Sequence, residues 1–242
     1  MAPVVHLRAA VALAGRFPAL AGVDLSIEQG EVVVVVGANG AGKTSLLRVC
    51  AGLLPVTSGE ATVLGVDLTA DHTTVRRYVG LLGHAAPLYD ELSAAENVRF
   101  AVRALGLSAR RADDALERLG LTGRLRTTPA GRLSAGQRRR VALAALLARR
   151  PALWLLDEPH AGLDAGSREL LGRLIGEAVE DGATALLSSH EPQLSVPLAD
   201  RVVAMGGGRV TGAERGGRRA PLTAVPSPAA GTHLGTGTSH VA

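Results

Sequence analysis

The stretch from Gly37 to Thr44 constrains the fold of this 242-residue chain more than any other part of the sequence. It reads Gly-Ala-Asn-Gly-Ala-Gly-Lys-Thr and matches the pattern of a glycine, four residues and then Gly-Lys-Ser/Thr. Five valines, Val32–Val36, precede it and predict a buried strand, and residues 45–50 have the pattern of a helix start. A strand, a glycine-rich loop and a helix in this order predict a phosphate-binding loop in an α/β fold.

Lys43 is the only lysine among the 26 basic residues of the chain. Glycines let successive backbone N–H groups converge on an anion, and the following helix adds the positive end of its dipole. An ammonium group is a compact point charge, whereas a guanidinium is planar and bulkier. We therefore predict that Lys43 contacts nucleotide phosphates and that the Thr44 hydroxyl binds Mg²⁺. The predicted nucleotide-binding residues of this loop are Gly37, Ala38, Asn39, Gly40, Ala41, Gly42, Lys43, Thr44 and Ser45.

Two acidic residues, Asp157 and Glu158, follow a second short apolar run at Leu153–Leu156. Phosphoryl transfer needs one group that neutralises phosphate charge and another that positions the nucleophile. Because the chain already contains a phosphate-binding loop, we predict that Asp157 holds Mg²⁺ and that Glu158 orients and polarises the attacking water.

Hydrophobic periodicity predicts strands that alternate with helices, and a helical region between them. Ser93 and Glu96 have the spacing of a capping box at the start of that helical region. The predicted strands span residues 4–7, 23–27, 32–36, 79–82, 153–156 and 183–188, and the predicted helices span residues 93–119, 135–148 and 168–180.

The composition argues against several classes of protein. The net charge is +4, but the arginines are scattered and only 2% of the residues are aromatic, so no nucleic-acid partner is expected. The single cysteine, Cys50, excludes an internal disulfide and is predicted to be a small buried residue. We find no secretory signal and no apolar run of about 18 residues that would predict a membrane span.

The segment Leu133–Gln137 reads Leu-Ser-Ala-Gly-Gln and stands just before a predicted helix. Placed between the phosphate-binding loop and the Asp-Glu pair, it resembles the signature of the ATP-binding cassette family, Leu-Ser-Gly-Gly-Gln, with Ala135 in place of the first glycine. The resemblance implies that Ser134 and Gly136 contact the γ-phosphate of an ATP molecule that a second copy of the chain holds.

Two further positions resemble motifs of this family. Residues 161–164, Ala-Gly-Leu-Asp, resemble its D-loop and imply a role for Asp164 at the interface with the second copy. His190 follows the predicted strand at 183–188 and resembles the switch histidine, which bonds the γ-phosphate. The resemblance thus implies Lys43, Glu158 and His190 as catalytic residues, with ATP and Mg²⁺ as the bound species.

Two positions depart from the family pattern. His84 stands where the family usually has a glutamine that senses Mg²⁺ and the partner, and histidine retains the ability to donate or accept a hydrogen bond. The family also stacks adenine on an aromatic residue near the N-terminus. Phe17 is the one aromatic candidate, whereas the usual spacing points to Ala14, so both positions stay open.

The resemblance covers about Val4 to Val210. It implies an α/β P-loop NTPase fold with a RecA-like parallel sheet core, an N-terminal antiparallel β subdomain and the helical insert of ABC ATPases. We predict a nucleotide-binding domain at residues 1–211, with a helical subdomain at about 88–145. Residues 212–242 are rich in proline, glycine, serine and threonine and are predicted to form a disordered tail.

This resemblance implies an ATP-hydrolysing subunit of an ABC transporter. Two copies would form a homodimer that encloses two ATP molecules head to tail. Separate transmembrane permease subunits would dock on the helical insert near His84, which predicts a peripheral location at the cytoplasmic face of the cell membrane.

A finer resemblance links residues 82–84, 93–100 and 133–144 to the ATPase subunits of haem exporters of cytochrome c biogenesis. The ATPase of another exporter, for drugs, lipids or peptides, is an alternative. A soluble ABC-type ATPase acting on nucleic acid or ribosomes is another, but only about 90 residues separate Lys43 from Leu133 and they contain no sustained heptads. The chain also has one cassette rather than two.

Overall fold

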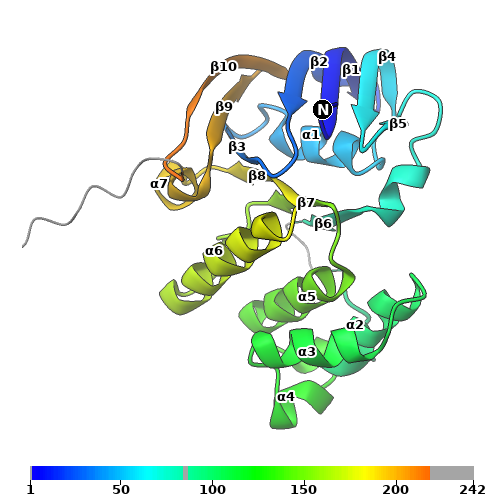
Figure 1. Cartoon of the computed structure of the whole chain (residues 1–242), viewed down its shortest axis with the longest axis vertical. Coiled ribbons are helices and arrows are strands. Elements are labelled where there is room, and N and C mark those ends of the chain that lie inside the picture. The colour runs from blue at the N-terminus through cyan, green and yellow to red at the C-terminus, as the bar shows by residue number, and fades with distance from the viewer. Residues whose placement is uncertain (1, 84–86, 219–242) are drawn as a thin grey trace, which may run out of the picture.

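The computed structural model describes residues 2–83 and 87–218, which form two β-sheets with helices around them (Figure 1). The larger sheet contains β3 (Val32–Val36), β6 (Val79–Leu82), β7 (Leu153–Asp157), β8 (Thr184–Ser189), β9 (Arg201–Gly206) and β10 (Arg209–Arg215). Their order is β10-β9-β3-β8-β7-β6, and all neighbours pair in parallel except the edge pair β10 and β9. The carboxyl ends of β3, β7 and β8 therefore lie side by side.

The smaller sheet is antiparallel and comes from the N-terminal part of the chain. It contains β1 (Val5–Ala14), β2 (Phe17–Ile27), β4 (Val56–Val63) and β5 (Val66–Asp67), in the order β2-β1-β4-β5. The predicted fold class, an α/β fold with a parallel sheet core and an N-terminal antiparallel subdomain, is confirmed.

Seven α-helices accompany the sheets in the described part of the chain. They are α1 (Lys43–Cys50), α2 (Ala94–Arg103), α3 (Arg110–Arg118), α4 (Gly123–Thr127), α5 (Ala135–Arg149), α6 (Ala165–Glu180) and α7 (Pro192–Ser195). Short 3₁₀ turns occur at Thr74–Arg77, Ala130–Arg132 and Val196–Leu198. Figure 1 shows α2 to α5 grouped together, away from the antiparallel sheet. None of the helices described has the length and hydrophobicity that a membrane crossing requires.

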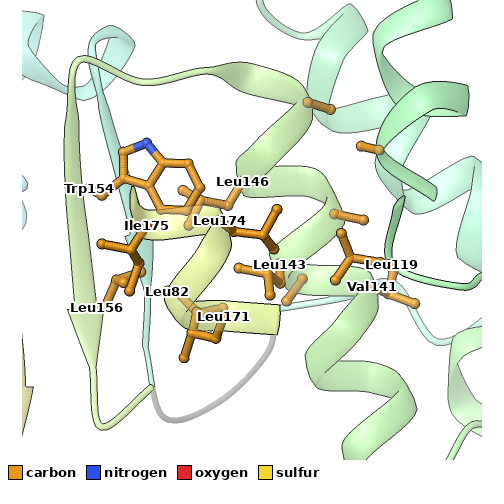
Figure 2. Close-up of a cluster of buried hydrophobic side chains, with 14 of the residues drawn as sticks. Leu82, Leu119, Val141, Leu143, Leu146, Trp154, Leu156, Leu171, Leu174 and Ile175 are labelled. Carbon is orange, nitrogen blue, oxygen red and sulfur yellow. The ribbon is translucent and has the colours of Figure 1, made fainter. Parts of the chain in front are cut away.

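The valines of β3 contribute to two hydrophobic cores, one on each face of the larger sheet. Val32 and Val34 pack into one core with the helices α5 and α6, and Val33 and Val35 pack into the other with α1 and the antiparallel sheet. A parallel strand buried on both faces reads as a continuous apolar run, which is the pattern of this segment. Figure 2 shows part of the first core, where Trp154 and Leu156 of β7 lie near Leu171 and Leu174 of α6.

Cys50 lies at the end of α1, in the core that faces the antiparallel sheet, and is fully buried. Burial raises the pKa of its thiol to about 12, so the group stays protonated and unreactive at neutral pH. The prediction of a small buried residue is confirmed.

The helical region predicted at 93–119 is two helices rather than one. Helix α2 ends at Arg103 and α3 begins at Arg110, and between them Gly106 adopts a left-handed backbone with φ of 70°. The predicted capping box is confirmed, since the Ser93 hydroxyl accepts from the Glu96 backbone N–H and the Glu96 carboxylate accepts from the Ser93 N–H. The spacing of Ser93 and Glu96 predicted the start of α2, but hydrophobic periodicity did not predict the break between α2 and α3.

The predicted start of the tail at residue 212 is wrong. Strand β10 continues to Arg215 and pairs with β9, so the sheet extends four residues beyond the predicted boundary at 211. The side chains of β10 are mostly exposed, so the strand is held by backbone pairing and carries no apolar pattern. The rest of the predicted tail, from residue 219, lies outside the described residues, as does His84.

Candidate nucleotide-binding and hydrolysis site

The loop between β3 and α1 has the backbone that a phosphate-binding loop needs. Gly37 and Gly42 adopt φ values of 152° and 103°, and Gly42 caps the N-terminus of α1. A Cβ at Gly37 would lie 2.3 Å from the carbonyl oxygen of Met205, and one at Gly42 would lie 2.8 Å from that of Ala19. Both positions therefore require glycine for conformation and for space.

Lys43 folds back across this loop and is only 7% exposed. Its ammonium donates to the carbonyl oxygens of Gly37 at 2.8 Å and Ala38 at 3.3 Å. The same Nζ lies 4.0 Å from Oε1 of Glu158. The single lysine of the chain thus joins the two ends of the loop and faces the second predicted motif.

A pocket of about 390 Å³ opens over the loop. It is lined by Ala19, Asn39, Gly40, Ala41, Gly42, Lys43, Thr44, Ser45, Asp157 and Glu158. The structure therefore brings most of the predicted loop together with both predicted acids. Ala19 belongs to β2, two residues after Phe17 (79% exposed), so the antiparallel sheet contributes to one wall of the pocket. Phe17 is the exposed aromatic side chain nearest in sequence to that wall.

Thr44 and Asp157 meet on the floor of the pocket although 113 residues separate them. The Thr44 hydroxyl lies 3.0 Å from each oxygen of the Asp157 carboxylate. A hydroxyl and a carboxylate, both hard oxygen donors, fit the ligand preference of Mg²⁺. The two metal-binding residues predicted from sequence are thus in direct contact in the structure.

Glu158 follows the end of β7 in a strained conformation. Its φ of 48° lies in the left-handed region, which non-glycine residues rarely adopt. Its backbone N–H donates to the Ser188 hydroxyl at 3.0 Å, and one carboxylate oxygen, Oε2, accepts from the backbone N–H of His190 at 3.0 Å. The His190 ring nitrogen Nδ1 lies 2.6 Å from the same oxygen. The turn aims the Glu158 side chain into the pocket, and His190 holds it there.

Ser188 contacts both predicted acids, and the sequence patterns did not single it out. It is fully buried at the end of β8, opposite Asp157 in the parallel register. Its hydroxyl donates to Oδ1 of Asp157 at 2.6 Å while it accepts from the Glu158 backbone. One side chain therefore fixes both acids. A buried serine at the carboxyl end of the strand next to the Asp-Glu strand was the signal that could have found it.

Replacing Ser188 with alanine is expected to lower kcat by about tenfold, because it frees the Asp157 carboxylate and leaves the N–H of the strained Glu158 without its acceptor. The unpaired N–H should also cost about 1–3 kcal/mol of folding free energy. Steady-state ATPase kinetics and thermal unfolding measure the two effects.

Thr184→Val is the matched control, since Thr184 is equally buried at the other end of β8 and its hydroxyl accepts from the Gly30 N–H at 3.1 Å. That variant should lose a similar amount of stability and keep its kcat. Equal losses of kcat in the two variants would show that Ser188 acts only through stability.

The predicted signature residues do not join this pocket within one chain. Ser134 caps α5, accepting from the Gln137 N–H at 3.3 Å, and it is exposed, whereas Gly136 is half-buried. Asp164 caps α6 in the same way, accepting from the Ser167 N–H at 2.7 Å, and this hydrogen bond lowers the pKa of its carboxyl. These three residues line no part of the pocket around Lys43.

Comparisons with known proteins agree with this geometry. The family model described as ABC transporter matches residues 20–161. The cytochrome c biogenesis ATP-binding export protein CcmA of Bordetella bronchiseptica is 44% identical over 188 residues, covering 76% of this chain and 83% of the relative. The protein of the same name from Cupriavidus pinatubonensis is 40% identical over 195 residues, covering 80% and 84%.

Among solved structures, the dimeric post-hydrolysis state of the ATP-binding cassette MJ0796 bound to ADP and Pi has a TM-score of 0.80 and 28% identity. It covers 87% of this chain and 98% of that one. The chain belongs to the ABC transporter family, as an ATP-binding and ATP-hydrolysing subunit. Within the family it is similar to the export ATPases of cytochrome c biogenesis, which confirms the finer resemblance predicted from its sequence.

Proposed function

We propose that this chain binds ATP with Mg²⁺ in the pocket around Lys43 and that its hydrolysis powers export through separate membrane subunits. We further propose that the export serves cytochrome c biogenesis and that haem is the cargo. The observation that carries the proposal is the convergence of the Thr44–Asp157 pair and the Glu158–His190 pair beside the phosphate-binding loop. The similarity to CcmA proteins supports the finer assignment.

The chain's own residues divide the chemistry among them. The loop N–H groups and Lys43 bind the phosphates, and Thr44 and Asp157 would hold Mg²⁺, which neutralises phosphate charge during phosphoryl transfer. Glu158 orients the attacking water and accepts its proton. His190, which contacts the Glu158 carboxylate, would bond the γ-phosphate of ATP.

A second copy of the chain completes each site in this proposal. The exposed Ser134 and the half-buried Gly136 lie at the N-terminus of α5, a place that suits an anion, but they lie apart from the pocket of their own chain. The homologous cassette MJ0796 forms a dimer. A head-to-tail homodimer would bring these residues, with Asp164, to the γ-phosphate held by the partner.

A groove between β6, α2 and α5 fits a membrane subunit. It has a volume of about 270 Å³, and its lining includes Leu81, Leu88, Tyr89, Phe100 and Ala145. Tyr89 and Phe100 are 54% and 50% exposed, and their rings meet edge to face with centroids 5.1 Å apart. Aromatic side chains exposed beside an apolar groove are typical of an interaction site. We propose that permease subunits dock here and hold the chain at the cytoplasmic face of the membrane.

Phe100→Glu is expected to abolish co-purification with the membrane subunits, because a buried carboxylate without a partner is costly at an interface. ATPase activity of the isolated chain should stay unchanged, since Phe100 lies outside the nucleotide pocket. Leu53→Glu, at another exposed apolar residue, is the control and should leave membrane association intact.

Maturation of c-type cytochromes tests the cargo. Cells that lack this chain should fail to attach haem to these cytochromes, and the wild-type chain should restore attachment. Normal maturation without the chain would exclude haem export and favour an exporter with another cargo. Nucleic acid that stays bound to the purified chain at moderate salt would instead favour an ABC-type ATPase acting on nucleic acid.

A further inference from the structure

Arg139 is a buried cation that none of the roles above uses. It lies on α5, five residues after Ser134, and is 9% exposed. Burial lowers the pKa of its guanidinium, and the nearby Asp157 carboxylate opposes that effect. A guanidinium stays charged in proteins, so Arg139 places a permanent positive charge at the carboxyl end of β7.

The contacts of Arg139 reach the carboxyl ends of two neighbouring strands, β6 and β7. One terminal nitrogen, Nη1, donates to the carbonyl oxygen of Gly83, the residue after β6. The other, Nη2, donates to the carbonyl oxygens of Asp157 at 3.3 Å and Glu158 at 3.1 Å. Arg139 thus binds the backbone carbonyls of the two predicted acids.

The guanidinium suits this place because its donors diverge in a rigid plane and can reach carbonyls of two strands at once. Glu158 turns into the left-handed region, and its carbonyl oxygen accepts two hydrogen bonds, from the backbone N–H of Ala161 at 3.1 Å and from Arg139 at 3.1 Å. The Arg139 side chain therefore ties the strained turn at Glu158 to helix α5.

Helix α5 carries the signature residues at its exposed N-terminus and packs on α2 and α3 within the helical group. A movement of α5 that follows contact between Ser134 and a nucleotide on the partner would act on the Glu158 turn through Arg139. We propose that Arg139 is a positioning residue that couples the signature end of α5 to the Glu158 carboxylate of the same chain. Each ATP site would then sense the occupancy of the other.

This coupling rests on the two-chain site proposed above. It adds the prediction that one chain communicates between its two half-sites through a single side chain, since Arg139, in the second turn of α5, joins this helix directly to the end of β7.

Arg149 provides a matched control on the same helix. Its guanidinium donates to backbone carbonyls as well, those of Val79 at 3.0 Å and Arg76 at 3.4 Å. These carbonyls lie at the opposite end of β6, away from the nucleotide pocket. Arg139 and Arg149 therefore tie α5 to the two ends of the same strand.

The test compares Arg139→Met and Arg149→Met by ATPase kinetics and thermal unfolding. Both should lose similar stability. Arg139→Met should lower kcat by about tenfold or more with KM for ATP within about threefold, because it displaces the catalytic group without touching the phosphate loop. Arg149→Met should keep both constants within about twofold. Arg139→Lys, which keeps the charge but not the planar fork, should fall between.

A second measurement follows ATP-dependent dimer formation by light scattering in chains that also carry Glu158→Gln. Adding Arg139→Met should raise the ATP concentration needed for the dimer by about tenfold, while binding of a fluorescent ATP analogue to the monomer stays unchanged. Adding Arg149→Met should change neither.

Equal effects of the two methionine variants, in proportion to their loss of stability, would overturn the coupling. If Arg139→Met does not fold, Arg139→Lys decides by the same criterion, and a wild-type kcat in that variant would overturn the proposal. If the wild-type chain hydrolyses ATP but the Glu158→Gln chain forms no ATP-dependent dimer, the two-chain site itself is wrong. A dimer that is indifferent to Arg139 would leave the two-chain site in place and remove only the coupling.

Discussion

Replacing Glu158 with glutamine is expected to reduce ATP turnover by about a hundredfold or more while ATP still binds. Glutamine keeps the size of the side chain and one oxygen for the backbone N–H of His190, which lies 3.0 Å from Oε2 of Glu158. It removes the negative charge that would accept a proton from the attacking water. Steady-state phosphate release measures the loss.

The same substitution should stabilise the dimer that ATP forms. The Glu158 carboxylate faces the pocket and would repel the γ-phosphate, so the neutral amide removes a repulsion as well as a base. Light scattering with ATP should detect a long-lived dimer, and ADP should not produce one. Retained hydrolysis would show that Glu158 is not the residue that activates water.

Glu180→Gln is the matched control because Glu180 is an exposed carboxylate at the end of α6, remote from the pocket. It should hydrolyse ATP at the wild-type rate and form no trapped dimer. A decrease shared by both variants would point to net charge instead of to the position of Glu158.

The phosphate-binding loop and the Asp-Glu strand were predictable because each is a local pattern. The geometry of the loop depends on adjacent glycines, and Asp157 and Glu158 directly follow an apolar run. The shared role of Thr44 and Asp157 in binding Mg²⁺ was predictable from their chemistry. The parallel strands β3, β8 and β7 bring the two residues together in the structure. Residue spacing along the chain was therefore enough to predict a functional residue wherever that residue belongs to a local motif.

Ser188 could not be assigned in this way because its role depends on register. The predicted strand at 183–188 ended at this residue, but only the pairing of β8 with β7 sets it opposite Asp157. A shift of one residue would have turned the hydroxyl to the other face of the sheet. Asp157 and Ser188 lie about 30 residues apart, and the sequence of neither strand indicates how the two strands are aligned.

Arg139 was missed for a different reason. It is the middle of three consecutive arginines, Arg138–Arg140, and such a run usually indicates a solvated surface. On a helix, residues three, four and seven apart share a face, which places Arg139 in line with the buried Ala142, Leu143 and Leu146. An arginine in register with an apolar stripe was the available signal for a buried functional cation.

Lys43→Arg is expected to lower ATPase efficiency, kcat/KM, by about a hundredfold although it keeps the positive charge. Lys43 is 7% exposed, and its Nζ sits between the carbonyl oxygens of Gly37 and Ala38. A guanidinium is larger than an ammonium and its donors lie in a plane, so it would meet the loop backbone or push into the phosphate position.

ATP binding by a fluorescent analogue and steady-state hydrolysis separate the two possible effects, loss of affinity and loss of rate. Arg48→Lys, a basic substitution on the exposed side of α1, is the control and should behave as wild type. Wild-type kinetics in Lys43→Arg would mean that charge alone is required and that arginine could have replaced lysine here as it has elsewhere in the chain. A large loss would explain why the one lysine among 26 basic residues stands at this position, since it is the place where the shape of the cation matters as much as its charge.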